Sequence, residues 1–337
     1  MGYRVAIVGG SGYTGGELLR LVSAHPDLDV GTVTAHGNAG EKVGTLHPGL
    51  RGVAELTFAQ TSPQVCADAD LVFLALPHGT SGAFAEKLAT GQRVVDLGAD
   101  HRLRNVEAYE RYYSGDYHPA WTYGLPELPG QRARIASASR VANTGCYAAA
   151  TILALAPLIA SGLAEPDDVV VVAASGTTGA GRAAKAHLLA SEIMGDLSAY
   201  RVGAHQHVPE ILQATGARTL SMTALLAPMP RGILATVTAR PARSATSVMV
   251  REVLAGAYDV EPFVHVLPEG QQPHTAATAG SNAAHLQASV DLNSGRLIVT
   301  CAIDNLGKGA AAQAVQNANL MLGLAETAGL TADGIAP

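Results

Sequence analysis

The 337-residue sequence has few cysteines, few charged residues and no long hydrophobic run. Its three cysteines, Cys66, Cys146 and Cys301, show no CxxC or Cys/His spacing. We therefore expect neither a disulfide framework nor a zinc site, and we place the chain in a reducing cytoplasm. No cluster of Lys and Arg occurs and the formal net charge is -6, which argues against nucleic acid and anionic membrane surfaces as partners.

The sequence also offers no segment that predicts a membrane span. The longest uncharged run, residues 147–164, consists mostly of small residues and contains Pro157 and Gly162, so we expect a core helix. The apolar stretch at the N-terminus is too short for a signal peptide. What the chain does have is 48% hydrophobic residues, enough to bury a large core and to form two domains.

One cysteine stands in a setting that favours reactivity. The stretch Ala142-Asn143-Thr144-Gly145-Cys146-Tyr147 leads directly into an apolar run with a helical pattern, so Cys146 is predicted at a helix N-terminus. The backbone N–H groups and the dipole of a first turn stabilise a thiolate, which is the nucleophilic form. The alternative is a buried cysteine that serves as a small hydrophobe.

The N-terminal residues predict a dinucleotide-binding unit. The strand Tyr3–Val8 is followed by Gly9-Gly10-Ser11-Gly12-Tyr13-Thr14-Gly15-Gly16 and then by a helical run over 17–22. The glycines stand as G9-x-x-G12-x-x-G15, which lets backbone N–H groups at the helix N-terminus approach a pyrophosphate. A plain tight turn is the alternative.

The second strand predicts which dinucleotide is bound. It spans 30–35 and ends in His36-Gly37-Asn38-Ala39-Gly40, without the Asp or Glu that holds the ribose 2′-hydroxyl of NAD. We therefore expect NADP, with its 2′-phosphate met by His36, Asn38, Lys42 and backbone amides.

Two further strands of the first half end in loops that carry polar residues. The strand over 69–76 runs into Pro77-His78-Gly79, and ligands gather at such carboxyl ends. The run over 93–98 leads to Asp100 and Arg102, which form either a solvated loop pair or part of a structural or functional site.

The second half alternates strands and helices in a different pattern. Its strands are expected at 169–174, 220–226, 232–238, 285–290 and 297–303, in a mixed or antiparallel sheet with helices on one face. The first of them ends in the small-residue loop Ser175–Arg182, which suits a close approach to a nicotinamide or a phosphate. A long helix is expected from Ala310 to Leu324.

Two histidines are candidates for the acid/base group that a thiolate enzyme needs. Pro209 suits the first turn of a helix, so the residues before it are predicted to be extended, with His205 and His207 on the same side. A metal-binding pair and two exposed polar residues are the alternatives. We assign the acid/base role to His207, which is nearer to Glu210, and a substrate-holding role to His205; the reverse order stays open.

Taken together, these segments resemble the N-acetyl-gamma-glutamyl-phosphate reductase family, NADP-dependent semialdehyde dehydrogenases of arginine biosynthesis. The resemblance is near full length and rests on short segments in a specific order: Gly9–Gly15, Leu76–Gly79, Gly98–Asp100, Tyr123–Leu128, Gly145–Tyr147, Ser175–Arg182, His205–Glu210, Pro230–Gly232 and Asp304–Gly309. It implies an α/β protein with a Rossmann-type NADP-binding domain over 1–145, completed by a C-terminal helix over 306–337. It further implies an α+β catalytic and oligomerisation domain over 146–305, with a mixed or antiparallel sheet like that of aspartate-semialdehyde dehydrogenase.

The resemblance also implies that the motif cysteine is the nucleophile, and the patterns above supply other candidate site residues. The nucleophile is Cys146, and the proposed catalytic set is Cys146, His207, His205 and Glu210. The expected cofactor-binding residues are Gly9, Ser11, Gly12, Tyr13, Thr14, Gly15, His36, Asn38, Pro77, His78, Ser175, Gly176 and Asn305. The expected substrate-binding residues are Asn143, Arg102, Arg182 and His205. The partners are a small-molecule acyl phosphate and further copies of the chain, in a homodimer or homotetramer.

The sequence departs from the family at two places. Thr144 and Ala148 replace prolines around the cysteine, and Gln206 replaces the arginine of a His-Arg-His segment. The second change leaves open which cation meets the substrate phosphate or carboxylate, with Arg182, Arg102 and Lys185 as candidates. Rival functions are a carrier-linked aminoadipyl-phosphate reductase, aspartate-semialdehyde dehydrogenase, and a non-catalytic NADP-sensing regulatory protein.

Overall fold

The computed structural model describes residues 2–335 and separates the chain into two compact units. Unit 1 contains the chain up to Thr144 together with Ala310–Leu330, and unit 2 contains Gly145–Gly309 and the segment from Thr331 on. Residues 1, 336 and 337, which the expected domain ranges include, lie outside the described residues. The assignment of 1–145 to cofactor binding and of 146–305 to catalysis remains a prediction.

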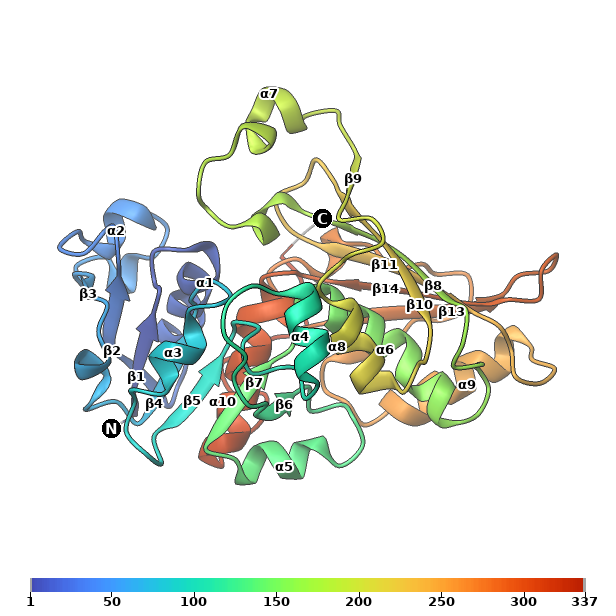
Figure 1. The fold of residues 1–337 in the computed structure, drawn as a ribbon, viewed down its shortest axis with the longest axis horizontal. Coiled ribbons are helices and arrows are strands. Elements are labelled where there is room, and N and C mark those ends of the chain that lie inside the picture. Colours follow the sequence, from blue (N-terminus) through green and yellow to red (C-terminus); the bar gives the residue numbers. More distant parts are fainter. Residues whose placement is uncertain (1, 336–337) are drawn as a thin grey trace. The chain divides into compact units, whose positions relative to one another are not determined.

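Unit 1 is built on a parallel sheet in the order β3-β2-β1-β4-β5-β7-β6 (Figure 1). Its strands are β1 Tyr3–Val8, β2 Leu28–Ala35, β3 Ala59–Gln60, β4 Leu71–Leu74, β5 Arg93–Asp96, β6 Thr122–Gly124 and β7 Arg140–Asn143. Its helices are α1 Tyr13–Ser23, α2 Val43–Leu46, α3 Ser81–Ala85, α4 Val106–Tyr112, α5 Gln131–Ser137 and α10 Ala312–Leu322, with short 3-10 turns at Arg51–Val53 and Pro63–Cys66.

The strand order of unit 1 creates a place for a ligand. The chain runs outward from β1 to β2 in one direction and from β4 to β5 in the other, so the order reverses between β1 and β4. In open parallel sheets, ligands bind beyond the carboxyl ends of the strands at such a reversal. The turn after β1 and the loop after β4 therefore flank the expected binding place.

Two strands of unit 1 are shorter than the sequence predicted. β4 ends at Leu74 rather than at residue 76, and β5 ends at Asp96 rather than at residue 98. Pro77 has no N–H to donate to a neighbouring strand, and Gly98 donates its N–H to the side chain of Asp96 at 2.7 Å instead of continuing the ladder. These residues thus become loop at the carboxyl edge.

Unit 2 is built on a mixed sheet in the order β12-β13-β14-β11-β8-β10-β9. Its strands are β8 Val169–Ser175, β9 Ser198–Tyr200, β10 Leu220–Leu226, β11 Ile233–Ala239, β12 Val264–Val266, β13 Ala284–Val290 and β14 Leu297–Ile303. Its helices are α6 Cys146–Ala160, α7 Ala190–Ile193, α8 Val208–Thr215 and α9 Ser247–Tyr258, with 3-10 turns at Thr177–Ala180, Ala186–Leu188 and Ala276–Thr278 and a π-helix at Gly307–Ala311. The mixed sheet expected from the sequence is confirmed.

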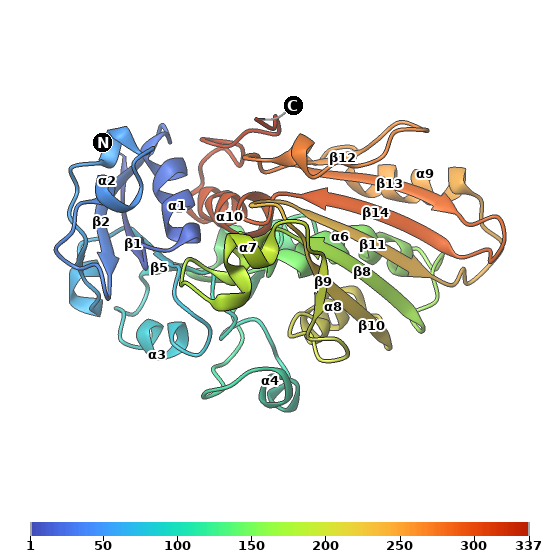
Figure 2. The same ribbon diagram turned by 90° about the horizontal axis from the view of Figure 1, so that it is seen from above.

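The two faces of this sheet differ in what covers them. Helices α6, α8 and α9 pack on one face, and Figure 2 shows the long strands side by side, in front of α6 and α9. Burial alternates along β8, with Val169, Val171 and Ala173 buried against the helices and Val172 42% exposed on the other side. The helix-free face is thus accessible and partly apolar in the isolated chain.

The last helix is shorter than expected. The sequence predicted a helix from Ala310 to Leu324, and the implied C-terminal helix extended to residue 337. In the structure α10 ends at Leu322, because Gly323 takes a left-handed conformation (φ +69°) that caps the helix, and the described residues beyond it form turns.

Candidate active site

Cys146 is the first residue of α6, as the sequence predicted. Gly145 is the N-cap residue in extended conformation, and no side chain caps the first turn. Among the three cysteines only Cys146 is not fully buried. Burial raises the pKa of Cys66 to about 11 and that of Cys301 to about 12, which keeps both as inert thiols.

Two contacts within unit 2 fix the backbone at Cys146. The N–H of Gly145 donates to Oε1 of Glu210 at 2.8 Å, and Glu210 is completely buried. On the other side, a Cβ placed on Gly309 would lie 2.8 Å from the Cβ of Cys146, so the π-helix packs directly against the cysteine. Glu210 thus positions the turn that carries Cys146, whereas its predicted role toward a histidine stays a prediction.

The backbone at the two histidines differs from the prediction. We expected extended residues before Pro209, but His207 has α-helical dihedral angles and serves as the N-cap of α8, and Val208 donates its N–H to the carbonyl of His205 at 3.1 Å. Proline is tolerated in the first turn, so the helix can begin at Val208 and the preceding residues close into a turn. That turn, rather than strand alternation, brings the two rings to a centroid distance of 5.0 Å.

Two tyrosines enclose His205. The ring of Tyr147 lies edge-on to it at 5.2 Å and that of Tyr200 at 5.7 Å, and the Tyr200 hydroxyl donates to the Tyr147 hydroxyl at 3.0 Å. Burial is the main cause that lowers the pKa of His205, to about 4, and the nearby positive charge of Arg201 adds to the effect. His205 is therefore neutral near pH 7.

The same ring cluster lies close to the cysteine. Burial raises the pKa of the Tyr200 hydroxyl to about 12, and the negative charge of a Cys146 thiolate contributes to that rise. The pKa of Tyr147, the residue after Cys146, is raised by burial and by Tyr200. Two imidazoles and two phenols thus form one ring cluster in unit 2, and one of the phenols belongs to the residue after Cys146.

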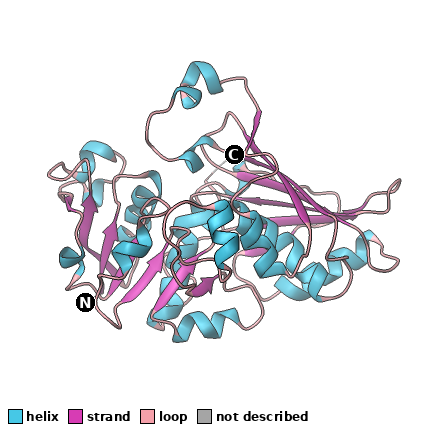
Figure 3. Cartoon of the chain, viewed as in Figure 1, coloured by secondary structure: helices cyan, strands magenta, loops and turns pink. Residues whose placement is uncertain are grey.

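Three residues expected to bind the cofactor come together elsewhere in unit 2. Asn305 accepts the N–H of Gly232 at 2.8 Å and donates to the Thr178 hydroxyl at 2.9 Å, while Gly176 donates to the carbonyl of Gly232 at 2.9 Å. The buried Ser175 donates to the carbonyl of Gly176. Arg182 and Lys185 follow on an exposed segment between β8 and β9, which Figure 3 shows as loop with short helices.

The glycine turn of unit 1 fits a dinucleotide. Gly9 has φ +88°, and a Cβ there would meet the carbonyl oxygen of Ala75 at 2.4 Å; a Cβ on Gly15 would meet that of Gly9 at 2.3 Å. Gly12 is the N-cap of α1, with no side-chain cap and no acidic residue in the first turn, where Tyr13, Thr14 and Gly15 present backbone N–H groups. Such an uncapped helix N-terminus suits the pyrophosphate, and the partly buried Ser11 lies in the same turn.

The residues after β2 that were expected to meet a 2′-phosphate are partly or fully exposed. His36 is exposed, and Asn38 donates to Glu41 at 3.1 Å. Lys42 forms an ion pair with Glu55, and both side chains are exposed. Their contact with a cofactor remains a prediction.

The loop after β4 is held by a buried carboxylate. Asp100 accepts the N–H groups of Gly79 at 2.7 Å and of Gly82 at 2.9 Å, which fixes the exposed residues Pro77 and His78 between β4 and α3. Neighbouring Asp96 is also buried, and its burial raises its pKa to about 6.

The structure corrects one alternative in this region. The prediction that Asp100 and Arg102 form a solvated loop pair is wrong. Both side chains are buried, and Arg102 donates to the carbonyl of Leu97 at 2.9 Å. Asn143, a predicted substrate ligand, is likewise 1% exposed and bonds to the carbonyl of Ala310 and to Asn317 within unit 1. The substrate roles of Asn143 and Arg102 stay predictions.

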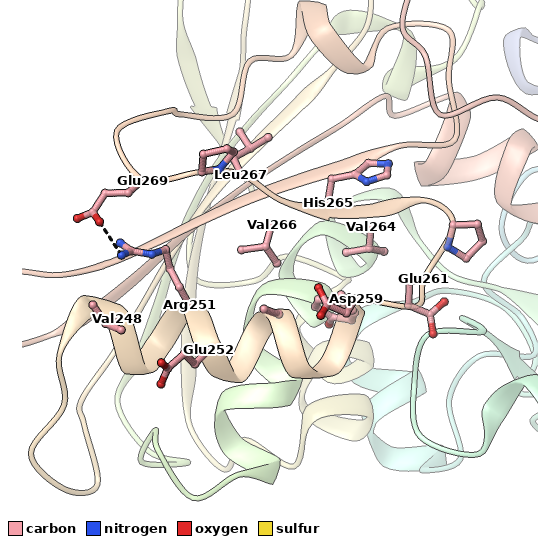
Figure 4. A pocket seen from close by; sticks show the side chains of 14 residues that line it. Val248, Arg251, Glu252, Asp259, Glu261, Val264, His265, Val266, Leu267 and Glu269 are labelled. Carbon is pink, nitrogen blue, oxygen red and sulfur yellow. Dashed lines mark hydrogen bonds and ion pairs between the residues drawn. The ribbon is translucent and has the colours of Figure 1, made fainter.

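A groove of unit 2 lies apart from all of these residues. It runs between α9 and β12 and is lined by acidic side chains, by Arg251 and by His265 (Figure 4). None of the expected site residues lines it. Within residues 2–335, no three His, Cys, Asp or Glu side chains are grouped so that they could hold a metal ion, and no helix is long and apolar enough to span a bilayer.

Comparison with known proteins identifies the family. The family described as semialdehyde dehydrogenase, NAD binding domain, matches residues 4–138, and that described as semialdehyde dehydrogenase, dimerisation domain, matches residues 146–305. The chain is 67% identical over 337 residues to the N-acetyl-gamma-glutamyl-phosphate reductase of Salinispora arenicola and 57% identical over 343 residues to that of Acidothermus cellulolyticus, with 100% of each chain covered. The chain belongs to the N-acetyl-gamma-glutamyl-phosphate reductase family.

Solved structures show the same fold at low sequence identity. Aspartate semialdehyde dehydrogenase II from Vibrio cholerae is 16% identical and matches 96% of this chain and 99% of its own, with a TM-score of 0.71. Aspartate semialdehyde dehydrogenase with NADP from Candida albicans is 15% identical, with 96% and 99% covered and a TM-score of 0.66. As a member of the reductase family, the chain is a semialdehyde dehydrogenase that uses a nicotinamide cofactor and oligomerises.

Sequence reasoning about this family member assigned no site role to three residues that the structure brings to the site region. Tyr200, Arg201 and Gly309 lie beside the cysteine or the histidines only because turns bring them there, and the sequence carries no spacing signal for them. Asp100 was weighed, but nothing in the sequence indicated that it would bind the loop after β4.

Proposed function

We propose that this chain catalyses the NADPH-dependent reduction of N-acetyl-γ-glutamyl phosphate to N-acetylglutamate 5-semialdehyde and phosphate, in the cytoplasm and as a step of arginine biosynthesis. One observation carries the proposal: Cys146 begins an uncapped helix, and the ring of the next residue, Tyr147, contacts the ring of the neutral His205 at a centroid distance of 5.2 Å. The 67% sequence identity, over the full length of the chain, to a protein named N-acetyl-gamma-glutamyl-phosphate reductase supports the choice of substrate.

The choice of NADP rests on the end of β2. No carboxylate occupies residues 36–40, where an NAD enzyme holds the ribose 2′-hydroxyl, and His36 is exposed there. A bound NADPH supplies the hydride that reduces the acyl group.

In the first step Cys146 attacks the acyl carbon of the substrate. A carbon–sulfur bond forms, the bond from carbon to the phosphoryl oxygen breaks, and its electron pair leaves with phosphate. The thioester accepts hydride more readily than a carboxylate does. Collapse of the resulting thiohemiacetal breaks the carbon–sulfur bond, which releases the aldehyde and restores the thiolate.

The surrounding groups handle charge and protons. Backbone N–H groups in the uncapped first turn of α6 stabilise the thiolate and the oxyanion on the acyl carbon. His205 donates a hydrogen bond to the acyl oxygen as a neutral imidazole, and His207 is the acid/base, contributing about 10²–10⁴-fold. Glu210 holds the Gly145–Cys146 turn in place.

The reverse reaction provides the test. Purified protein is mixed with N-acetylglutamate semialdehyde, phosphate and NADP, and NADPH formation is followed by absorbance. Turnover is expected for the wild type and for Cys66→Ala, whereas Cys146→Ser is expected to lose it while still binding NADP. Turnover retained by Cys146→Ser rejects the mechanism.

Substitution of the substrate and cofactor separates the rival functions. Faster turnover with aspartate semialdehyde or with a carrier-bound aminoadipate semialdehyde points to a related reductase. NADP binding without turnover on any of the three points to a regulatory protein. A preference for NAD over NADP contradicts the assignment made at β2.

We further propose that oligomerisation uses the helix-free face of the unit 2 sheet and yields a homodimer or homotetramer. Val172 is 42% exposed there, which suits burial against a second copy. Val172→Lys is expected to lower the mass measured by light scattering, and Val260→Lys, at a valine that is 89% exposed, is the matched control. An unchanged mass for Val172→Lys contradicts the proposed face.

A further inference from the structure

The turn between β9 and the histidines has an unusual backbone. Arg201 has φ +47°, one of two positive φ values among the non-glycine residues that the structure describes. Its carbonyl accepts the N–H of Ala204 at 3.1 Å and so closes the turn. A left-handed conformation at a residue with a Cβ is unfavourable, and it persists where neighbouring contacts impose it, often at functional sites.

Contacts on both sides hold Arg201 in this conformation. The preceding Tyr200 pairs with Ala224 of β10 and donates its hydroxyl hydrogen to Tyr147 of α6. The guanidinium Nη1 of Arg201 donates to Oε1 of Gln206, which lies between the two histidines. The hydrogen bond to Gln206 thus holds Arg201 next to the two histidines, while Arg201 remains exposed.

The charge of Arg201 acts on the same group of side chains. It adds to the effect of burial in lowering the pKa of His205, and it opposes the rise in the pKa of Tyr200. Two other cationic residues of unit 2 have different surroundings. Arg231 forms an ion pair with the buried Asp304 at 2.8 Å, and Lys308 is completely buried.

We propose that Arg201 binds the phosphoryl group of the acyl phosphate, and inorganic phosphate in the reverse direction. The inference deepens the proposed function and rests on it for the identity of the substrate. A guanidinium has five N–H donors in a planar fork, of which Gln206 takes one, so donors remain for two phosphate oxygens.

Position decides between the two anionic groups of the substrate. The phosphoryl oxygen is bonded to the carbon that Cys146 attacks. Arg201 follows Tyr200 of the ring cluster and hydrogen-bonds Gln206, which lies between the two histidines. The α-carboxylate lies at the other end of the substrate chain. As the carbon–oxygen bond breaks, its electron pair passes to the phosphate, and the fixed charge of Arg201 stabilises the leaving group.

This inference names a cation that sequence reasoning did not consider. The candidates from the sequence were Arg182, Arg102 and Lys185, but Arg102 is buried in unit 1 and donates to Leu97. The glutamine at 206 supplies no charge itself; its carboxamide oxygen holds a guanidinium that comes from five residues earlier in the chain.

The test measures phosphate dependence in the reverse reaction. Arg201→Asn removes the charge and keeps a residue type that tolerates a left-handed backbone, and it is expected to raise the KM for phosphate about 10- to 100-fold. The KM for NADP is expected to stay unchanged. Arg201→Lys should recover part of the loss, and Arg218→Asn, at an exposed arginine paired with Asp167, is the matched control.

A second measurement is independent of turnover. Inorganic phosphate is expected to slow the alkylation of Cys146 by iodoacetamide in the wild type and in Arg218→Asn, but not in Arg201→Asn. Equal protection in Arg201→Asn overturns the proposal, as does a rise in the KM for the semialdehyde with an unchanged KM for phosphate. If phosphate protects the wild type but not Arg201→Asn, and the wild type shows no turnover, phosphate binding at Arg201 is supported and the proposed function is rejected.

Discussion

The backbone N–H of His207 donates a hydrogen bond to Nδ1 of His205 over 3.2 Å. An imidazole nitrogen that accepts a hydrogen bond carries no proton, so the proton of the neutral ring lies on Nε2. His205 is therefore a hydrogen-bond donor near pH 7 rather than a base. The division of roles proposed above, with His205 holding the acyl oxygen and His207 transferring the proton, follows from this relationship.

The first prediction concerns His205 and pH. Its pKa is about 4 in the folded protein against an ordinary value of 6.5, so the unfolded state binds more protons between these values. The free energy of unfolding should therefore fall as pH drops from about 6.5 to about 4, by at most about 3 kcal/mol from this group. Urea unfolding of the wild type and of His205→Gln across this range measures the difference.

Other groups make that comparison with the variant necessary. Burial also lowers the pKa of His25, His101 and His285, with the same sign, whereas Asp96, with its pKa raised to about 6, acts in the opposite direction. NMR of labelled histidines gives a direct check. A His205 ring that titrates near 6.5, or that carries its proton on Nδ1, contradicts the assignment.

The second prediction concerns the bond from Gly145 to Glu210. Glu210→Gln retains an oxygen that accepts this N–H and should keep most of the activity. Glu210→Ala leaves the buried N–H without a partner, which should cost about 1–3 kcal/mol of stability and, by displacing Cys146, about 100-fold in kcat/KM. If Glu210→Gln is as impaired as Glu210→Ala, the negative charge matters and the positioning role is insufficient.

The third prediction concerns Gly309. An alanine Cβ there would lie 2.8 Å from the Cβ of Cys146 and 3.2 Å from the carbonyl of Asp304, so the helix start must shift. Gly309→Ala should reduce kcat by about 100-fold and slow the alkylation of Cys146. Gly256→Ala in α9, where no atom lies within 4 Å of the added carbon, should leave kcat unchanged and raise stability by about 0.5–1 kcal/mol. Equal kinetics in the two variants would show that the π-helix does not position the cysteine.

The fourth prediction concerns the glycine turn of unit 1. Gly15→Ala would place a Cβ 2.3 Å from the carbonyl of Gly9 and 2.6 Å from the Cα of Gly10, which forces the turn open. Loss of NADP binding is expected, measured as loss of the increase in melting temperature on adding NADP. Gly52→Ala, with open space around the added carbon, should bind NADP as the wild type does. Undiminished binding by Gly15→Ala would remove the turn from the cofactor site.

Local patterns determined much of the fold. The apolar run before Gly9 predicts β1, and the same glycines that shape the turn start α1, because both depend on neighbouring residues only. The start of α6 at Cys146 follows in the same way from the turn residues before it and the apolar run after it. Element ends were less predictable, as Gly98 and Gly323 illustrate, since a side-chain acceptor or a capping conformation decides them.

The sequence by itself determined that this chain carries a cysteine at a helix start, a glycine turn between a strand and a helix, and a pair of histidines, since each is encoded within a few adjacent residues. Only the tertiary structure decided how unit 2 uses them. Its turns bring Tyr200 and Arg201 to His205, Glu210 to Gly145 and Gly309 to Cys146. Burial then sets the charge of His205. The contacts of Glu210 and Gly309 join residues far apart in the chain, and those of Tyr200 and Arg201 depend on how a turn folds. A pKa depends on what surrounds a group in space, which no local spacing specifies.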